Sequence, residues 1–183
     1  MRGSNAWLAE QRIYGDPILS ECASMTANES SADAITFRPA TPDDAEELLK
    51  LQYLCYQPEA QRYGYGIQPL TQRLHEVVAE IKGGPSFVAL LDGLIVGGVR
   101  CRFEADVLHL GKLICHPRVQ RQGIGARLMA LAEQCARQRT DIKAVVLYTG
   151  ARSPNNLRFY QQRGYRPTHP MPPDFMWLRK ELG

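Results

Sequence analysis

The chain has 183 residues, of which 44% are hydrophobic, so it is long enough for one domain with a substantial core. Its net charge of +3 does not by itself indicate nucleic-acid binding, and no apolar run approaches the ~20 residues of a membrane span. The five cysteines show neither a Cys-x-x-Cys motif nor a Cys/His metal spacing. We therefore expect a cytoplasmic protein with reduced thiols and no metal, which acts neither on nucleic acid nor in a membrane.

The N-terminal 34 residues differ from the rest of the chain. They show no sustained hydrophobic periodicity, and their second half is small and polar, so we expect residues 1–34 to form a flexible extension. The start lacks the apolar segment of a signal peptide. In an alternative interpretation Met25 is the natural start and residues 1–24 are a leader. Residues 35–183 are predicted to form the single domain.

The domain is predicted to open with a strand, Ile35–Arg38, followed by a helix that begins at Thr41 and Pro42. Apolar residues at helical spacing predict a second helix that ends at Gly83. The segment between these two helices, residues 56–66, is rich in tyrosine and glycine and is interpreted as a loop.

The second half of the domain alternates strands and helices. Asp92 and Gly93 form a hairpin signal between two of these strands. The expected elements are strands at 87–91, 94–102 and 107–115, a helix at 123–138, a strand at 143–148, a helix at 153–164 and a strand at 175–182. This order predicts an α/β sandwich around a mixed sheet.

One loop carries the signal for an anionic ligand. A strand ends at Cys115, and a helix begins at Gly123 and Gly125. The first turn of a helix leaves backbone N–H groups unpaired, and glycine lets a phosphate approach them closely. No acidic residue lies between Asp106 and Glu133, whereas the stretch contains Lys112, Arg118, Arg121 and Arg127, with His109 and His116. This imbalance favours a polyanionic ligand.

Two common phosphate loops do not fit this segment. A dinucleotide-binding fingerprint requires a third glycine where the chain has Leu128, and the acidic residue near the expected distance, Asp141, precedes a strand. A P-loop requires Gly-Lys-Ser/Thr, which is absent. An ordinary turn or weak nucleic-acid binding would also be compatible with the glycines, but no exposed aromatic residues accompany the basic stretch.

Two motifs resemble a known family. The string Gln120-Arg121-Gln122-Gly123-Ile124-Gly125 is similar to the pyrophosphate loop of the GNAT superfamily of N-acetyltransferases, with the pattern Gln/Arg-x-x-Gly-x-Gly/Ala. The downstream segment from Asn156 to Tyr165 resembles the family's Phe-Tyr-x-x-x-Gly-Phe/Tyr segment at the usual spacing. The resemblance covers residues 35–182. It implies an α/β fold with a mixed, mostly antiparallel central sheet flanked by about four helices.

The resemblance also implies a cosubstrate, acetyl-CoA, and a set of residues that bind it. The backbone of the strand end is expected to pair with the pantetheine amides, and the loop is expected to hold the pyrophosphate. Ser153 stands where the family often has asparagine and is also predicted to cap its helix. The predicted set comprises Leu113, Ile114, Cys115, Gln120, Arg121, Gln122, Gly123, Ile124, Gly125, Ala126, Ser153 and Asn156.

The predicted catalytic residues are Tyr160 and His109. Tyr160 matches the family tyrosine that reaches the thioester sulfur, so it would protonate the leaving thiolate. His109 falls on a strand position where some members carry a glutamate, and its pKa range suits a general base. Other members use a glutamate at the position of Tyr148. Glu104 and Asp106 are alternative bases.

The resulting prediction is an acyl-CoA-dependent N-acetyltransferase that acetylates an amine by direct attack in a ternary complex. The acceptor would be a small molecule or a peptide, and the protein would be a monomer or homodimer. The acceptor is expected to be bound by the loops at 56–67 and 167–174, the first of which contributes Tyr56, Gln61, Arg62, Tyr63 and Tyr65. The alternative is an acyl-CoA-binding sensor or interaction protein with little catalysis.

Overall fold

The structure is a computed structural model, and it describes residues 35–183. The predicted flexible extension and the leader hypothesis therefore lie outside the described residues. Seven strands form one sheet: β1 Thr36–Pro39, β2 Ser86–Leu91, β3 Leu94–Glu104, β4 Val107–Cys115, β5 Ala144–Gly150, β6 Arg166–Met171 and β7 Phe175–Glu181. Five α-helices accompany them: α2 Ala45–Tyr63, α3 Gln68–Thr71, α4 Leu74–Gly83, α5 Ile124–Arg137 and α6 Pro154–Gln161.

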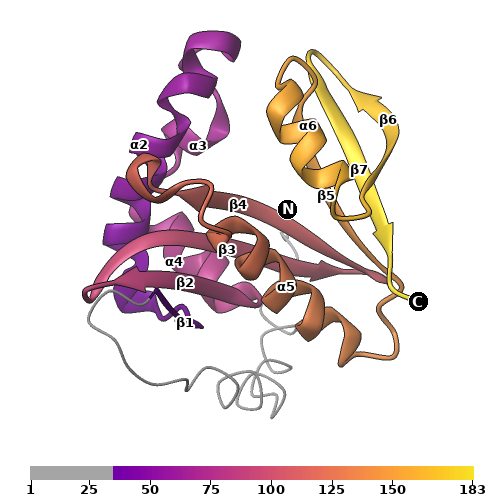
Figure 1. Cartoon of the computed structure of the whole chain (residues 1–183), viewed down its shortest axis with the longest axis horizontal. Coiled ribbons are helices and arrows are strands. Elements are labelled where there is room, and N and C mark those ends of the chain that lie inside the picture. The colour runs from indigo at the N-terminus through magenta and orange to yellow at the C-terminus, as the bar shows by residue number, and fades with distance from the viewer. Residues whose placement is uncertain (1–34) are drawn as a thin grey trace, which may run out of the picture.

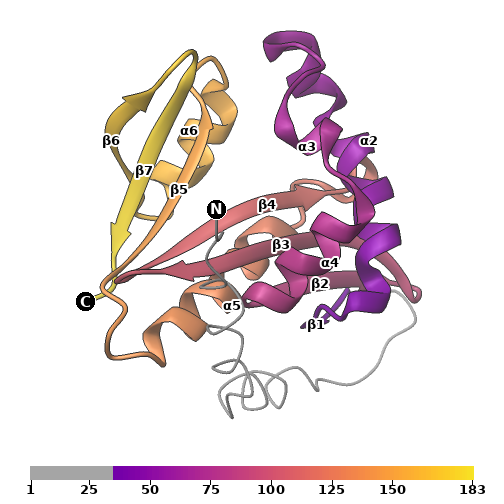
Figure 2. The same ribbon diagram turned by 180° about the vertical axis from the view of Figure 1, so that it is seen from behind.

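The strand order is β1-β2-β3-β4-β5-β7-β6, and every neighbouring pair is antiparallel except β4 and β5. Helices α2 and α4 cover one face of the first four strands, and α5 covers the other (Figures 1 and 2). The predicted mixed, mostly antiparallel sheet is thus confirmed. The structure has one more helix than the four expected, because a short α3 precedes α4.

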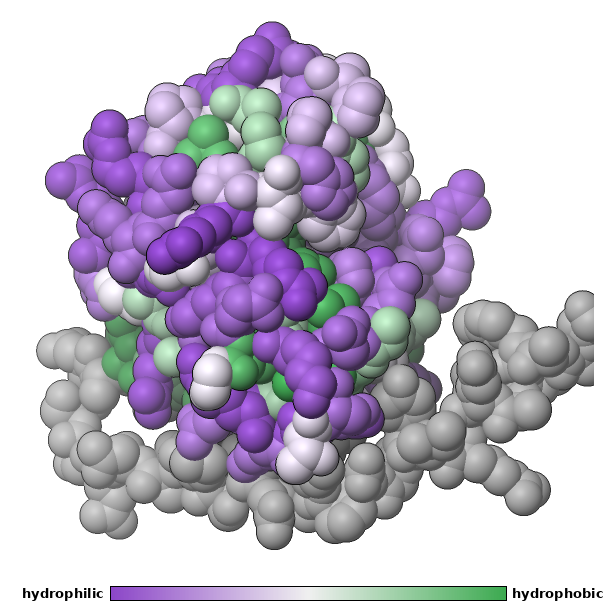
Figure 3. Space-filling view, turned by 90° about the vertical axis from the view of Figure 1, so that its right-hand side faces the viewer, coloured by the Kyte–Doolittle hydropathy of each residue, from purple (hydrophilic) through white to green (hydrophobic). Residues whose placement is uncertain are grey.

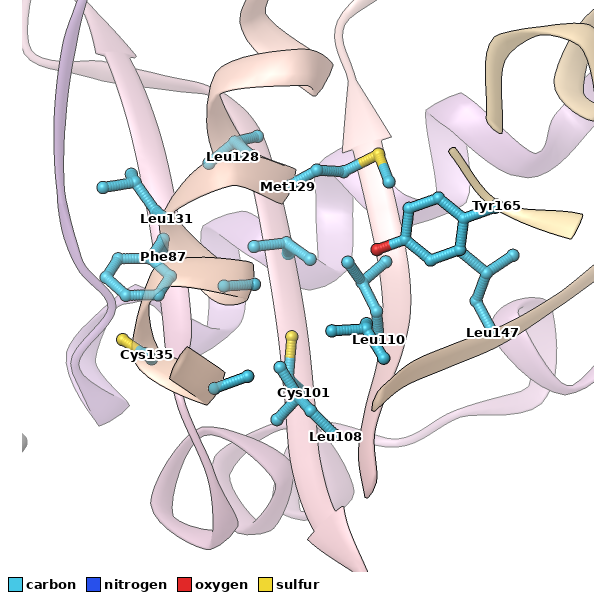
Figure 4. Packing of buried hydrophobic residues seen from close by; sticks show 14 of the residues in the cluster. Phe87, Cys101, Leu108, Leu110, Leu128, Met129, Leu131, Cys135, Leu147 and Tyr165 are labelled. Carbon is cyan, nitrogen blue, oxygen red and sulfur yellow. The ribbon is translucent and has the colours of Figure 1, made fainter. Parts of the chain in front are cut away.

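The larger hydrophobic cluster lies between the sheet and α5. Leu128 and Met129 of α5 are almost fully buried against Leu108 and Leu110 of β4. Tyr165 enters the same cluster from the segment after α6 (Figure 4). Burying side chains of this size contributes roughly 1.5–3 kcal/mol each. The side of the molecule shown in Figure 3 is largely hydrophilic, with hydrophobic residues in small separate patches.

Two adjacent glycines allow the helices to approach both faces of β3. A Cβ atom at Gly97 would lie 2.9 Å from the Ile124 side chain of α5, and one at Gly98 would lie 2.6 Å from the Leu48 side chain of α2. Successive residues of a strand face opposite sides of the sheet. Because these two positions carry no side chain, α5 and α2 can pack closely against the two faces of β3, the neighbour of β4.

The structure differs from the predicted elements in three segments. The expected loop at 56–66 is helical as far as Tyr63, because α2 continues through Pro58. The second predicted helix is divided into α3 and α4 by Gln72 and Arg73. The segment 167–174, expected to be a loop, contributes most of the edge strand β6.

Candidate active site

The strands β4 and β5 pair over only three residues each. The parallel register joins Val107 to Ala144, Leu108 to Val145 and His109 to Val146. Beyond these pairs the two strands diverge, and the sheet opens into two halves (Figure 1). The later residues of β4, including Leu113, Ile114 and Cys115, therefore have no strand partner on the β5 side. Backbone groups without a strand partner can pair with an extended ligand, although the Cys115 carbonyl already accepts from the side chains of Cys55 and Gln120.

A bulge in β4 lies on this unpaired stretch. Ile114 pairs with Gly98 and Gly111 pairs with Arg100, so two residues of β4 oppose only one residue of β3. One of the two, Lys112, has a positive φ of 48°. Bulges bend a strand and redirect its side chains. This bulge accompanies the departure of β4 from β5.

The loop after β4 presents backbone N–H groups at the start of α5. Gly123 adopts a left-handed conformation, with φ of 82°, and no side chain caps the helix. The first helical hydrogen bond is donated by the Arg127 N–H to the Gly123 carbonyl at 3.0 Å. The N–H groups of Ile124, Gly125 and Ala126 therefore have no partner within the helix. The loop residues Gln120, Arg121 and Gln122 are exposed beside them.

The charge around this loop is positive. Within residues 35–183, no carboxylate forms an ion pair with Arg118, Arg121 or Arg127. Together with the positive end of the α5 dipole, these arginines suit a bound pyrophosphate. The side chain of Gln120 donates to the Cys115 carbonyl at 3.2 Å, which ties the loop to the end of β4.

Tyr160 lies in α6, close to this helix start. Its ring contacts Phe159, with the centroids 5.3 Å apart. A Cβ atom at Gly125 would lie 3.4 Å from the Phe159 ring, so α6 and the start of α5 are neighbours. Burial, assisted by the negative charge of Glu59, raises the pKa of Tyr160 to about 12. The hydroxyl therefore stays protonated at neutral pH and can serve as a proton donor.

Ser153 does not cap α6 as predicted. Its side chain is buried and makes no capping hydrogen bond. Instead its hydroxyl donates to Glu59 at 2.9 Å, accepts from Arg62 at 3.0 Å, and lies 3.2 Å from the Tyr63 hydroxyl. The cap prediction is wrong because three polar groups on the extended α2 compete for the same hydroxyl. Asn156, also predicted to bind the cofactor, is half-buried on α6.

His109 lies at the paired end of β4, before the strands separate. Its Nε2 is 3.3 Å from a Glu104 carboxylate oxygen, and its ring contacts Trp177 edge-on, with the centroids 5.7 Å apart. Burial and the nearby Arg102 lower the pKa of His109, while Glu104 partly offsets them. The imidazole is therefore neutral at pH 7. The structure groups His109 with Trp177 rather than with Tyr160.

An aromatic cluster extends from His109 towards the end of α2. Trp177 contacts Tyr148, which contacts Phe175, and Phe175 stacks on Tyr63, with centroid separations of 5.3–5.8 Å. Tyr63 was expected near the acceptor, and it reaches β5 because Gly150 leaves room for its hydroxyl. The sequence did not predict that Tyr148, Phe175 and Trp177 belong to this cluster. The alternation of Phe175 and Trp177 along one strand does indicate that their side chains share a face of the sheet.

The structure also bears on metal and membrane association. Among the described residues there is no group of three or more His, Cys, Asp or Glu side chains that could hold a metal ion. The helices between residues 35 and 183 include none that is long and apolar enough to cross a membrane. Cys55, Cys101 and Cys115 are free thiols.

Residues 45–165 match the model of the acetyltransferase (GNAT) family, which covers more than half of the chain. The uncharacterized protein YxbD of Bacillus subtilis is 37% identical over 75 residues. That alignment covers 41% of this chain and 45% of YxbD, so it spans less than half the length of that relative.

Solved structures share the fold at low sequence identity. The PaiA N-acetyltransferase of Thermoplasma acidophilum, in complex with coenzyme A, aligns with a TM-score of 0.71 and 18% identity, covering 81% of this chain and 99% of that one. Ard1 of Thermoplasma volcanium aligns with a TM-score of 0.65 and 19% identity, covering 81% and 98%. An acetyltransferase of Thermus thermophilus aligns with a TM-score of 0.63 and 20% identity, covering 84% and 100%.

Proposed function

Because the chain belongs to the GNAT acetyltransferase family, we propose that it transfers the acetyl group of acetyl-CoA to an amine of a small molecule or peptide. The observation that carries this proposal is the uncapped start of α5 beside the unpaired end of β4. One feature suits a pyrophosphate, and the other suits an extended chain with amide groups. Acetyl-CoA, which contains both, would supply the activated acetyl group.

Apart from Ser153 and Asn156 of the α6 region, the residues predicted to bind acetyl-CoA would divide into two groups. The backbone of Leu113, Ile114 and Cys115 would pair with the pantetheine amides. The loop from Gln120 to Ala126 would hold the pyrophosphate, with Gly123 supplying the left-handed turn. A backbone N–H at the unpaired end of β4 would polarise the thioester carbonyl. Ser153 would contact the cofactor as well, although its hydroxyl already has three partners on α2, namely Glu59, Arg62 and Tyr63.

Tyr160 would act as the general acid. The amine nitrogen forms a bond to the acetyl carbon while the carbon–sulfur bond breaks, and the thiolate leaves with the electron pair. The raised pKa of Tyr160, about 12, keeps its proton available for that thiolate. The direct attack needs no acyl-enzyme. Burial also raises the pKa of the Cys115 thiol, which disfavours it as a nucleophile.

Two groups compete for the role of general base. His109 has a lowered pKa and is neutral at pH 7, so it would accept the amine proton directly or through water. Glu59 has no motif that marks it in the sequence, but its charge acts on Tyr160 and its carboxylate lies between α2 and α6. The aromatic residues Tyr63, Tyr148 and Phe175 would line the acceptor region between the two candidates.

A thiol-release assay with acetyl-CoA and a panel of amines tests the proposal. We expect amine-dependent release of CoA together with the N-acetylated amine. If acetyl-CoA binds tightly but no amine is turned over, the result would reject the transferase and favour the sensor that the sequence left as an alternative.

A further inference from the structure

A cluster of charged and amide side chains lies on the α2–α4 face of the sheet, and the proposed chemistry does not use it. At its centre is Arg100 of β3, which is only 3% exposed. Its Nε donates to a Glu80 carboxylate oxygen at 2.7 Å, and its Nη2 donates to the side-chain oxygens of Gln52 and Gln72. Gln72 in turn donates to the other Glu80 oxygen at 2.7 Å. Three side chains, from α2, from α4 and from the turn before α4, therefore fix this guanidinium in place.

One donor of this fixed guanidinium has no acceptor. The Nη1 atom of Arg100 is buried and has no hydrogen-bond partner in the part of the chain that the structure describes. Leaving a buried donor unpaired destabilises the folded protein, and the cost is larger when the group is charged. A ligand atom that accepted from Nη1 would recover this free energy.

The cluster also carries an excess of positive charge. Lys112, in the β4 bulge, has a side chain that is 12% exposed, and its Nζ lies 4.0 Å from Glu80. Burial lowers the pKa of Lys112, and the charges of Arg100 and Arg102 lower it further, while Glu80 and Glu76 act in the opposite direction. Within residues 35–183, Glu80 is the only carboxylate that forms an ion pair with Arg100 or with Lys112, so the two cations share it. One additional negative charge would balance the cluster, which fits a carboxylate better than a phosphate with nearly two charges.

The cluster is adjacent to the proposed transfer site. Lys112 lies in the stretch of β4 that has separated from β5, and Arg100 pairs with Gly111 across the same bulge. Tyr56 of α2 links the two regions electrostatically. Burial raises the pKa of Tyr56, Tyr160 and Tyr148 raise it further, and Arg100 partly lowers it. A ligand group beside Arg100 would lie next to the stretch of β4 that we propose to bind acetyl-CoA.

We propose that the acceptor is an amino-carboxylate, such as an amino acid, whose carboxylate binds between Arg100 Nη1 and Lys112 Nζ. This inference rests on the proposed acetyl transfer and adds the chemical class of the acceptor. Binding at this point would hold one end of the molecule on the α2–α4 face while its amine faces the acetyl group. The aromatic residues Tyr148 and Phe175 offer an apolar surface for the rest of the acceptor.

Matched acceptors test the inference directly. The thiol-release assay would compare glycine, β-alanine, γ-aminobutyrate and phenylalanine with their carboxamides, which keep the amine but lose the negative charge. We expect kcat/KM to be about 10- to 100-fold higher for the best acid than for its amide, as a charged hydrogen bond of about 1.5–3 kcal/mol implies. Equal or better use of the amides would overturn the inference and leave the acetyl transfer intact.

Variants test whether a preference for acids over amides depends on the cluster around Arg100. Lys112→Met should reduce kcat/KM for the acid at least about 10-fold through KM, while kcat/KM for the amide and the KM for acetyl-CoA stay unchanged. Lys50→Met is the control, because Lys50 is exposed and pairs only with Glu46 among the described residues. Arg100→Lys is a second variant with the same expected direction. An acid preference that survives in Lys112→Met would place the carboxylate elsewhere.

A binding measurement keeps the two proposals separate. Isothermal titration of CoA-saturated protein with N-acetylphenylalanine and with N-acetylphenylalaninamide needs no turnover. Tighter binding of the acid, lost in Lys112→Met, would support the carboxylate site even if no amine were acetylated. Equal binding or no binding of both compounds, with no acid preference in the assay, would overturn it.

Discussion

Tyr160 combines burial with a nearby negative charge, and both favour its protonated form. Replacing it with phenylalanine keeps the ring that packs in the core and removes only the proton donor. We expect Tyr160→Phe to lower kcat about 100-fold, because a positioned general acid contributes roughly 10²–10⁴-fold. Acetyl-CoA affinity, measured by titration calorimetry, should change less than about threefold. If kcat of Tyr160→Phe equalled that of the unmodified protein at every pH from 6 to 9, this role would be contradicted.

The pH dependence of kcat/KM distinguishes the two candidate bases. The pKa of His109 is lowered, so its neutral form is lost only below its ordinary range, and activity should fall as the pH drops through that lowered value. If His109 is the base, His109→Gln should reduce activity and abolish this acidic limb, and Glu59→Gln should preserve it. The opposite result would assign the base to Glu59. In either case Glu59→Gln should lower the pKa of Tyr160, because a negative charge is removed.

At the scale of elements, the turn into α5 should tolerate little besides glycine. Gly123 has φ of 82°, a conformation that costs about 1–2 kcal/mol for other residues. Gly123→Asp adds a negative charge beside the proposed pyrophosphate, and we expect acetyl-CoA affinity to fall more than about 100-fold. A Cβ atom at Gly123 would meet no heavy atom within 4 Å, so the fold should persist by circular dichroism.

Gly93→Asp is a matched control for this variant. Gly93 also has a positive φ, 79°, with open space around its Cβ position, but it lies in the turn between β2 and β3. The control should show the same small loss of stability and normal acetyl-CoA binding. Loss of binding in both variants would indicate a general effect of strain rather than a cofactor loop.

The contact between α2 and β5 depends on a second glycine. Any side chain at Gly150 would collide with the Tyr63 ring. Gly150→Val should displace the end of α2 and separate Tyr63 from Phe175. We expect a several-fold increase in the KM of the acceptor with little change in the KM of acetyl-CoA. Steady-state kinetics with each substrate varied in turn would check this, and an equal rise of both KM values would argue against a role specific to the acceptor.

The sequence predicted most elements, and the errors have physical causes. The stretch 56–66 contains a proline and two glycines, which favour a loop. In the structure the helix passes through Pro58, and it ends only at Gly64, whose φ is 91°. The strand β6 was missed because Pro167 and Pro170 argue against a strand. Both prolines lie in an edge strand, where one side of the backbone needs no partner.

At the scale of the whole molecule, the two halves of the sheet are joined at one end and separate at the other. Tyr165, which follows α6, donates to Glu133 of α5 at 2.9 Å, and Lys180 of β7 donates to the same carboxylate at 2.6 Å. These contacts connect the C-terminal half to α5. The acetyl-CoA region that we propose lies between the halves, at the unpaired end of β4.

The parts of the candidate site that the sequence predicted are contiguous motifs. The parts that it did not predict combine residues that only the folded chain brings together. The loop from Gln120 to Gly125 and the segment around Tyr160 are contiguous motifs, so the sequence alone indicated them. The Arg100 cluster combines residues from α2, α4, β3 and β4 and has no sequence signature. The predicted cap by the Ser153 side chain failed for the same reason, because its partner Glu59 belongs to a segment predicted to be a loop.

The most direct test of acetyl transfer follows the acetyl group itself. Protein would be incubated with acetyl-CoA labelled in the acetyl carbons and with a panel of amino acids and simple amines, and products and protein would be examined by mass spectrometry. We predict one labelled N-acetyl group per CoA released, no labelled protein, and loss of transfer in Gly123→Asp. Labelled acetate alone, or label retained on the protein, would contradict direct transfer to an amine.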